Sequence, residues 1–244
     1  MRRPSRAIFI FLLTIALLGG MVMLPLNSAS AVGTNPGTTI NLTDNNTTDY
    51  GAGVSSGTGN AAYFIKANSE SLTSPDNANI SMGDINFTIF GWVKYTSLTT
   101  STATFTTWHP LFEKGNGSGT ALGPMEYSIF YRTDTGVSCT VGNGTTYGEA
   151  FNTSTTITTG NWYFYVCTYN ATTDTISLYV NAGTPATASW TGGSYDSSNG
   201  LKVGSLRTST PYLDGYVDEI GIYKNRELTA DEISWLYNLS LIHI

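Results

Sequence analysis

Short apolar runs, separated by Gly, Asn, Asp and Pro, fill the chain from residue 61 onward. This pattern is typical of a many-stranded antiparallel sandwich, because each strand is brief and each turn needs residues that tolerate sharp backbone angles. The expected strands are residues 61–67, 87–95, 110–114, 127–133, 136–141, 161–169, 175–181, 200–205 and 213–223. The pattern therefore predicts an all-β fold.

The strand expected over residues 87–95 carries apolar side chains on both of its faces. Because side chains alternate along a strand, Phe90 and Trp92 point one way, while Ile89 and Val93 point the other. A strand that is apolar on both faces is typical of the centre of a sheet covered on both sides. Trp92, like Trp162 in the strand expected over 161–169, is accordingly interpreted as a core residue.

A single convincing helix is predicted at the end of the chain. Thr229 followed three residues later by Glu232 is a capping box, in which each side chain accepts a backbone N–H of the first turn. Ile233, Leu236 and Tyr237 share one face at helical spacing. We expect this helix to cover an edge or an open end of the sandwich.

The first 31 residues have the composition of a signal peptide. Three arginines lie within the first six residues, an apolar run follows over 7–18, and the segment ends in Ala29-Ser30-Ala31. A basic start, an apolar middle and small residues before the cleavage point are what signal peptidase needs. The alternative is an uncleaved membrane anchor over residues 7–26, which is long enough to span a bilayer. Both interpretations export the domain, either secreted or held at the cell surface.

The segments on either side of the predicted domain differ from it in composition. Residues 32–60 are rich in Thr, Asn, Gly and Asp, which favours a flexible polar segment or an edge strand. The last six residues, 239–244, match one reading frame of a transposon end used to build sequencing libraries. We interpret them as an artefact, so that the native chain continues beyond Asn238; an ordinary apolar tail is the alternative. The domain itself spans residues 61–238.

The charge of the chain excludes two classes of partner. Charged residues make up 11% of the sequence, against about 25% in an average soluble protein. Without residues 1–31, eight basic residues remain against 17 acidic ones, a formal charge of −9. Nucleic acids and anionic lipid surfaces bind cationic surfaces, so neither is expected as a partner. Membrane insertion is expected only if the N-terminal segment stays uncleaved.

The sequence contains two cysteines, Cys139 and Cys167, each within an expected strand. In an exported chain such a pair can form a disulfide, which would stabilise the fold by roughly 3–4 kcal/mol in the chain-entropy model. The alternative is two separate buried thiols, because the bridge requires Cα atoms within about 7 Å of each other.

Four segments together resemble a laminin-G-like (LamG, Laminin_G_3 type) jelly-roll domain of the concanavalin A-like lectin/glucanase superfamily. The segments are Phe87-Thr-Ile-Phe-Gly-Trp-Val-Lys94, Leu111-Phe-Glu-Lys-Gly115, residues 161–169 leading into Leu178-Tyr-Val-Asn181, and the closing run 214–233. The resemblance implies an antiparallel jelly-roll β-sandwich with one short C-terminal helix. This fold serves lectins, adhesion modules and glycosidases alike, so it does not by itself assign a function. The chain lacks the calcium-coordinating loop pattern of better-studied laminin-G members.

The sequence does not support an enzyme. Glycosidases need two carboxyl groups about 5–9 Å apart across a sugar-binding cleft. Asp218 and Glu219 are adjacent in an expected strand, so they point to opposite faces and cannot act as a pair. The only histidines are His109 and His243, which leaves no pattern for a nucleophilic triad. We therefore predict a non-catalytic protein.

One structural Ca²⁺ is the single cofactor that the sequence suggests. In the closing strand Asp218 shares a face with Tyr216, Ile220 and Ile222, and a buried carboxylate needs a cation or several hydrogen-bond donors. Asp214 and Glu219 lie close enough in sequence to complete a calcium site. The alternative is a hydrogen bond from loop backbone or from a nearby arginine.

Sugar binding calls for aromatic rings among polar groups at the loops of one rim, because the apolar face of a pyranose stacks on a ring. The candidate ligand-binding residues, which sit among turn residues, are Trp108, Trp190, Tyr147, Tyr195 and Tyr212. The leading hypothesis is an exported, non-catalytic recognition module that binds glycans or a cell-surface partner through these loops. The alternatives are a structural or adhesive domain of a larger surface protein and, third, a glycosidase with an unusual site.

Overall fold

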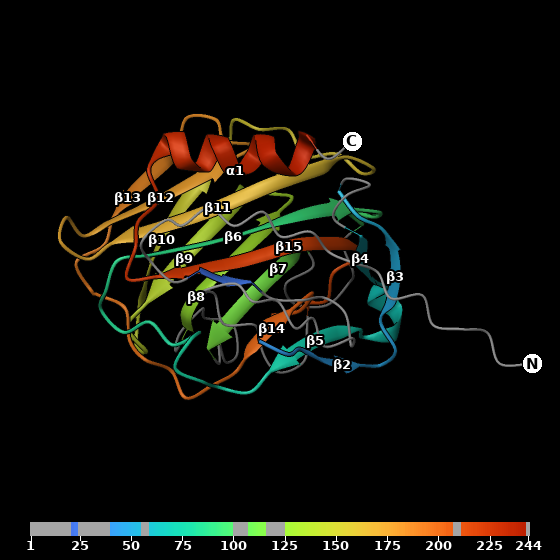
Figure 1. Cartoon of the computed structure of the whole chain (residues 1–244), viewed down its shortest axis with the longest axis horizontal. Coiled ribbons are helices and arrows are strands. Elements are labelled where there is room, and N and C mark those ends of the chain that lie inside the picture. The colour runs from blue at the N-terminus through green and yellow to red at the C-terminus, as the bar shows by residue number, and fades with distance from the viewer. Residues whose placement is uncertain are drawn as a thin grey trace, which may run out of the picture.

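The structure is a computed structural model that describes residues 21–23, 40–54, 59–99, 107–115, 125–206 and 211–242. Two antiparallel sheets stack face to face, and helix α1 (Ala230–Ile242) lies across the outer face of one of them (Figure 1). The jelly-roll sandwich with one short C-terminal helix is thereby confirmed.

The first sheet has eight strands among the described residues. Its order is β13 (Ala186–Ser189), β12 (Thr175–Val180), β11 (Trp162–Asn170), β6 (Phe87–Tyr95), β15 (Gly215–Lys224), β4 (Asn60–Phe64) and β3 (Asp49–Ala52). The eighth strand, β1 (Met21–Met23), pairs with residues 221–223 of β15. β1 falls within the predicted signal peptide; the rest of residues 1–31 lies outside the described residues, and the signal peptide stays a prediction.

The second sheet has seven strands among the described residues. Its order is β10 (Tyr147–Asn152), β9 (Gly136–Gly142), β8 (Met125–Arg132), β7 (Trp108–Gly115), β14 (Leu201–Val203), β5 (Ser71–Ser74) and β2 (Thr43–Asn45). One turn of 3₁₀ helix, η1 (Lys66–Asn68), precedes β5. All nine strands expected from the sequence are present, whereas β5, β10 and β13 were not expected because few of their residues are large and apolar. No helix in the described part of the chain is long and apolar enough to cross a membrane.

Strand β6 lies at the centre of the eight-stranded sheet and is covered on both faces. Ile89 and Val93 belong to the core between the two sheets, while Phe90 and Trp92 face outward into a second apolar cluster. The alternating pattern of this strand is therefore confirmed by its packing. Burial of a large apolar side chain contributes about 1.5–3 kcal/mol, so a strand buried on both faces anchors the fold.

Helix α1 begins with the predicted capping box. The Thr229 N–H donates to Glu232 Oε2 (3.0 Å), and the Glu232 N–H donates to Thr229 Oγ1 (3.3 Å). Ile233 is fully buried, and the ring of Tyr237 stacks on that of Trp92 at 5.4 Å. The helix covers the outer face of the eight-stranded sheet, because the Phe90 and Trp92 side chains offer it an apolar surface there. The expectation that it would cover an edge or an open end was wrong.

The two cysteines form a disulfide between the sheets. Cys139 in β9 and Cys167 in β11 are both fully buried, and their Cα atoms are 5.9 Å apart. This confirms the predicted bridge and excludes two separate thiols. The covalent link joins β9, the strand next to the edge strand β10, to β11 of the other sheet.

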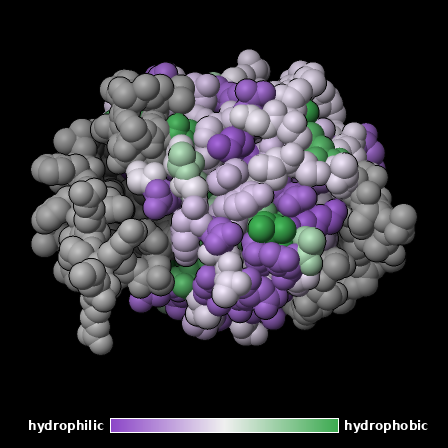
Figure 2. All heavy atoms as spheres, turned by 90° about the vertical axis from the view of Figure 1, so that its right-hand side faces the viewer, coloured by the Kyte–Doolittle hydropathy of each residue, from purple (hydrophilic) through white to green (hydrophobic). Residues whose placement is uncertain are grey.

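The edge strands β2 and β3 expose polar residues. Seen from their side of the molecule, the described surface is mostly hydrophilic, and apolar residues form only small separate patches (Figure 2). Each of the two strands carries an aspartate, Asp44 and Asp49, both exposed. Charged edge strands oppose pairing with a second sheet edge, so these residues disfavour aggregation.

The strand pairing places the connecting loops at one or the other of two opposite ends of the sandwich. At one end, which we call the Trp190 rim, lie residues 75–86, 143–146, 171–174 and 190–200. At the other end, which we call the Tyr212 rim, lie residues 65–70, 133–135, 153–161 and 211–214. These two rims are the places where loop residues can form a site.

Candidate functional site

The structure brings three of the five candidate aromatic residues together and separates the other two. Tyr147, Trp190 and Tyr195 lie at the Trp190 rim, and all three are half-buried. Tyr212 lies at the opposite rim, where it forms an isolated bridge with Ser205. Trp108 begins β7 at that same opposite end. The loops of a single rim therefore cannot use all five.

Trp108 was expected in a loop, but in the structure it is a packed residue at the start of a strand. It is 8% exposed, and its ring stacks on that of Phe130 at 4.7 Å with an interplanar angle of 3°. The guanidinium of Arg132 lies over the same ring, 5.1 Å from its centroid. Its neighbours in sequence are typical turn residues, but β7 begins at Trp108, and the ring turns onto the outer face of the seven-stranded sheet.

Trp190 fastens the loop after β13 to the edge strand of the other sheet. Its indole N–H donates to the carbonyl of Gly193 (2.7 Å), and its backbone N–H donates to the carbonyl of Asp174 (2.7 Å). The indole packs directly on Gly148 of β10, where a Cβ atom would come within 2.6 Å of it. Glycine is therefore required at that position, because any side chain would displace the indole.

Tyr195 lies next to Trp190 in the same loop and covers the connection between β9 and β10. Its ring packs on Gly144, and its backbone N–H donates to the carbonyl of Gly142 (3.2 Å). Gly142 is the register partner of Tyr147. Trp190 and Tyr195 thus pack from one loop against β10 and the connection before it, with the Trp190 ring over Gly148. Tyr147 points to the other face of β10, where it packs against the cluster of Trp108 and Phe130.

Asp84 ties two loops of the Trp190 rim together. Its Oδ1 atom accepts a hydrogen bond from the Tyr169 hydroxyl (3.2 Å) and another from the Ser194 backbone N–H (3.3 Å). The carboxyl group of Asp84 also lies against Gly193. Residues 75–86 and 190–200 are therefore held to each other and to β11.

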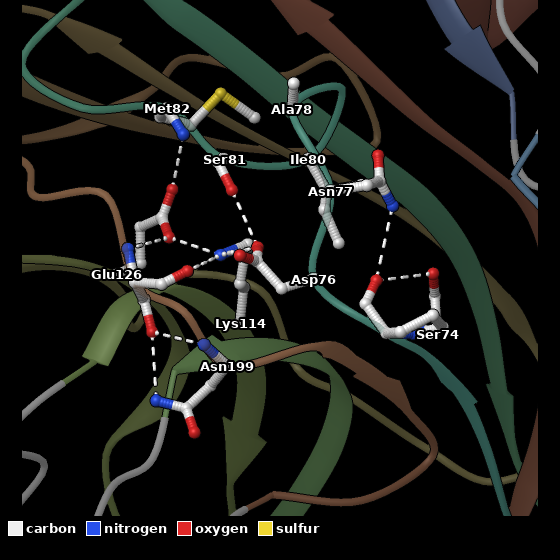
Figure 3. A network of polar contacts seen from close by, with 12 residues as sticks. Ser74, Asp76, Asn77, Ala78, Ile80, Ser81, Met82, Lys114, Glu126 and Asn199 are labelled. Atoms are coloured by element: carbon white, nitrogen blue, oxygen red, sulfur yellow. Dashed lines mark hydrogen bonds and ion pairs between the residues drawn. The ribbon is translucent and has the colours of Figure 1, made fainter.

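A buried ion network lies beneath the same loops. Lys114 and Glu126 have fully buried side chains, and Nζ of Lys114 is 2.8 Å from Oε2 of Glu126. Nζ is also 3.0 Å from Oδ1 of Asp76 and donates to the carbonyl of Ser197. Figure 3 shows the Lys114 ammonium between the two carboxylates. The three N–H groups of the ammonium thus meet three oxygen atoms.

The carboxylates of this network have further donors. The backbone N–H groups of Met82 and Ser197 donate to Glu126, and the Ser81 hydroxyl donates to Asp76 (2.7 Å). Burial raises the pKa of Glu126, although its contact with Lys114 opposes this. For Asp76 burial also raises the pKa, but the hydrogen bonds from Ser81 and Lys114 outweigh it and leave the pKa below its ordinary value. The network links β7, β8 and both long loops of the Trp190 rim.

Asp218 does not share a face with Ile220 and Ile222, because a β-bulge separates them. The pairing of β15 with β6 shifts between Asp218 and Gly221, and Glu219 adopts a left-handed conformation with φ of 45°. Asp218 consequently lies opposite Trp92 on the outer face, while Ile220 and Ile222 stay in the core between the sheets. The predicted alternation fails here because one extra residue resets it.

The three proposed calcium ligands do not converge in the described structure. The carboxylate of Asp218 accepts backbone hydrogen bonds from Val54 (2.8 Å) and Glu219 (2.9 Å). That of Asp214 accepts one from Lys66 (3.2 Å) at the Tyr212 rim. The described residues contain no group of three His, Cys, Asp or Glu side chains placed to hold a metal ion. Calcium binding stays a prediction.

Two carboxylate pairs that the described structure brings into one network or one register row do not have the arrangement of a glycosidase. Asp76 and Glu126 flank the Lys114 ammonium, and Glu126 is completely buried, so it cannot reach a substrate. Glu113 and Glu149 occupy one register row of the seven-stranded sheet but are three strands apart, about 14 Å between backbones. Glycosidases need carboxyl groups about 5–9.5 Å apart.

The half-buried Glu149 and the buried His109 have pKa values that are shifted in opposite senses. Burial raises the pKa of Glu149, which lies on the same face of β10 as Tyr147, to about 7, and the Ser138 side chain and the charge of Arg132 only partly oppose this. Burial lowers the pKa of His109, whose ring packs between Tyr95 and Tyr131, to about 4. His243 lies outside the described residues.

Replacing Glu149 by glutamine is expected to stabilise the protein at pH 7.5 and to have little effect at pH 4.5. A carboxyl whose pKa rises on folding stabilises the fold below its unfolded pKa, and this contribution is lost as the pH rises to about 7. Glutamine mimics the protonated form, so the variant should gain up to about 3 kcal/mol over this range. Urea unfolding of both proteins between pH 4.5 and 7.5 measures the difference, and the opposing titration of His109 cancels because both proteins share it. A pH-independent difference would contradict the prediction.

Two stacked antiparallel sheets with a jelly-roll arrangement place the protein among the concanavalin A-like sandwiches. The chain belongs to the Laminin_G_3 family of the concanavalin A-like lectin/glucanases superfamily, whose family model matches residues 66–234. No curated protein matches the chain.

Solved structures share the fold at low sequence identity. Domain 4 of AbnA, an extracellular GH43 arabinanase from Geobacillus stearothermophilus solved with arabinotriose, is 18% identical over 78% of this chain and 81% of that one, with a TM-score of 0.57. The binding domain of Paraclostridial Mosquitocidal Protein 1 is 17% identical over 82% of this chain and 47% of that one, with a TM-score of 0.63.

A third structure, described for the entry of botulinum neurotoxin type C through two ganglioside molecules, is 17% identical over 91% of this chain and 51% of that one, with a TM-score of 0.60. The chain therefore spans about half the length of the two toxin structures. At these identities the likeness establishes the fold.

Proposed function

We propose that this protein is an exported, non-catalytic module that binds glycans at the Trp190 rim. The observation that carries the proposal is that one loop places Trp190 and Tyr195 against β10 and the connection between β9 and β10, where their rings lie among polar loop residues. Half-buried rings with polar loop residues around them can stack on a sugar while amides and carboxylates take its hydroxyls. Trp190 itself holds the loop, and Tyr147 packs against the Trp108 cluster on the other face of β10, so Tyr195 is the ring that we expect to stack on the sugar.

The rigidity of the rim supports the same function. Binding costs less free energy when the loops are already fixed, because fewer side chains lose freedom on association. Asp84 and the Lys114 network fix both long loops before any ligand arrives. Several proteins of the same fold are described with sugar ligands, including arabinotriose, N-acetylneuraminic acid and gangliosides. A sugar is accordingly the class of ligand that we propose here.

Replacing Tyr195 by alanine is expected to weaken glycan binding about five- to thirtyfold, since stacking on a ring contributes on the order of 1–2 kcal/mol. Tyr195→Phe should bind nearly as well as the wild type, because the ring is kept. Binding would be measured on a glycan array, with and without Ca²⁺, and then by calorimetry with the best ligand.

Tyr212→Ala is the matched control, because Tyr212 is a half-buried tyrosine at the opposite rim. Equal losses in Tyr195→Ala and Tyr212→Ala would refute the Trp190 rim as the site. If the wild-type protein binds no glycan under either condition, the proposal fails and a structural or adhesive domain becomes the better interpretation.

A further inference from the structure

A row of aromatic and charged side chains crosses the outer face of the eight-stranded sheet. Trp162, Lys94, Tyr216, Tyr63 and Asp49 are consecutive register partners on β11, β6, β15, β4 and β3. With about 4.8 Å between neighbouring strands, the row is about 19 Å long. Asp49 is exposed and the other four residues are half-buried, so the row is accessible to solvent. We call it the Lys94 row.

The rings of this row hold Lys94 in place. Its Nζ atom lies 4.3 Å from the ring centroid of Tyr216 and 4.8 Å from that of Trp162. The ring of Tyr63 stacks on the Tyr216 ring at 4.4 Å, with 20° between their planes. The Tyr216 ring also leans over Gly51 of β3, where a Cβ atom would lie only 2.5 Å from it. The lysine is thus clamped between two rings, one of which is itself fixed.

The ammonium of Lys94 has no acidic partner in the described part of the chain. Other lysines there donate to oxygen atoms: Lys114 to its network, Lys224 to the Ala78 carbonyl and Lys66 to the Thr99 carbonyl. Burial beside the rings removes part of the hydration of the Lys94 ammonium and thereby lowers its pKa. A partly desolvated cation that contacts only ring faces retains N–H groups able to donate to an anion.

From this arrangement we propose that the Lys94 row binds the carboxylate of an acidic sugar residue. The ammonium of Lys94 pairs with the carboxylate, and the Trp162 ring packs on the apolar face of the same sugar. The chain carries a formal charge of −6, so an isolated cation between aromatic rings is a local exception that selects for a negative ligand group. The row lies at the other end of β6 from the Trp190 rim, and the proposal stands whether or not that rim binds a glycan.

The structure favours a carboxylate on a sugar over an acidic peptide. The row is a single line of rings and one ammonium across neighbouring strands of a sheet, with one cation as its centre. A pyranose offers an apolar face of the size of one ring, and its carboxylate lies at the edge of that face. One aromatic contact and one ion pair can therefore be made by a single sugar residue.

The test uses trigalacturonic acid and sialyllactose as acidic probes, with their methyl esters as neutral controls. Calorimetry with the full chain should show binding of at least one acid, at least tenfold weaker binding of its ester, and an affinity that falls as salt rises. Lys94→Met keeps the aliphatic stem between the rings and should lose at least tenfold in affinity. Lys94→Arg should retain most of it, and Lys224→Met, which removes a lysine at the Trp190 rim, should have no effect.

Further measurements distinguish binding at the Lys94 row from binding at the Trp190 rim, and from a variant that fails to fold. Tyr195→Ala should leave binding of the acid unchanged, and the indole N–H signal of Trp162 in an NMR spectrum should shift on titration. The melting temperature of Lys94→Met should stay within a few degrees of the wild type; if it does not, Lys94→Gln replaces it. Equal affinity for acid and ester, unchanged affinity in both Lys94 variants, or no binding of either acid would overturn the proposal.

Discussion

Replacing Lys114 by methionine is expected to lower the free energy of unfolding by about 3–5 kcal/mol, because it leaves the buried carboxylate of Glu126 without its cation. The loss should shrink in acid, where Glu126 can take up a proton on folding and become neutral. Urea unfolding at pH 7 and at pH 4.5 measures both effects. A loss below about 1 kcal/mol at pH 7 would show that the network contributes little.

Two variants sharpen this experiment. Lys224→Met should cost under about 1 kcal/mol, since the Lys224 ammonium donates one exposed hydrogen bond to the Ala78 carbonyl. Lys114→Met combined with Glu126→Gln should recover part of the loss, because glutamine carries no charge. Its single amide oxygen can keep only one of the hydrogen bonds from the Met82 and Ser197 N–H groups, so the recovery is incomplete. A double variant less stable than Lys114→Met alone would contradict this explanation.

Removing the disulfide, by replacing Cys139 and Cys167 with alanine, is expected to cost about 2–5 kcal/mol. The bridge restricts the unfolded chain across a separation of 28 residues, and its loss also frees the two sheets from each other. Thermal unfolding with and without a reducing agent measures this. The agent should lower the melting temperature of the wild type and leave the double variant unchanged; equal effects on both would contradict the prediction.

The sequence predicts the fold well where local patterns decide it. The alternation around Phe90 and Trp92 identifies a central strand, and Thr229 with Glu232 locates the start of the helix within one residue. Both signals depend on neighbours in sequence, so no long-range information is needed. The disulfide could be proposed but not settled, because the distance between Cys139 and Cys167 depends on how the sheets stack.

The candidate site was harder to predict, because its key residues meet only through long-range pairing. Lys114 and Glu126 are fully buried, although charged residues in strands are ordinarily read as facing solvent. Two shifts of register within the pairing of β7 and β8 alter which residues point inward, and the sequence gives no clear sign of them. The bulge after Asp218 does have a signal in the sequence, since a glycine such as Gly221 inside a strand pattern often marks a bulge.

The burial of Trp162 could not be predicted from the sequence either. Its position within a strand favoured a core residue, whereas it is half-buried and lies beside Lys94 on an outer face. Period-two patterns assign residues to faces but do not say which face another element covers. Helix α1 covers Phe90 and Trp92 and leaves the Lys94 row accessible, which is a property of the whole fold.

The bridge between Cys139 and Cys167 also sets how far the protein can be stretched. If the chain is pulled from its ends, the 28-residue separation closed by the bridge cannot extend while the bond is intact. At roughly 3.4 Å per extended residue, the intact bridge shortens the fully stretched chain by about 90 Å. Under tension the oxidised chain therefore lengthens less than the reduced one, and the segment from β9 to β11 stays a covalently closed unit after the sheets have come apart.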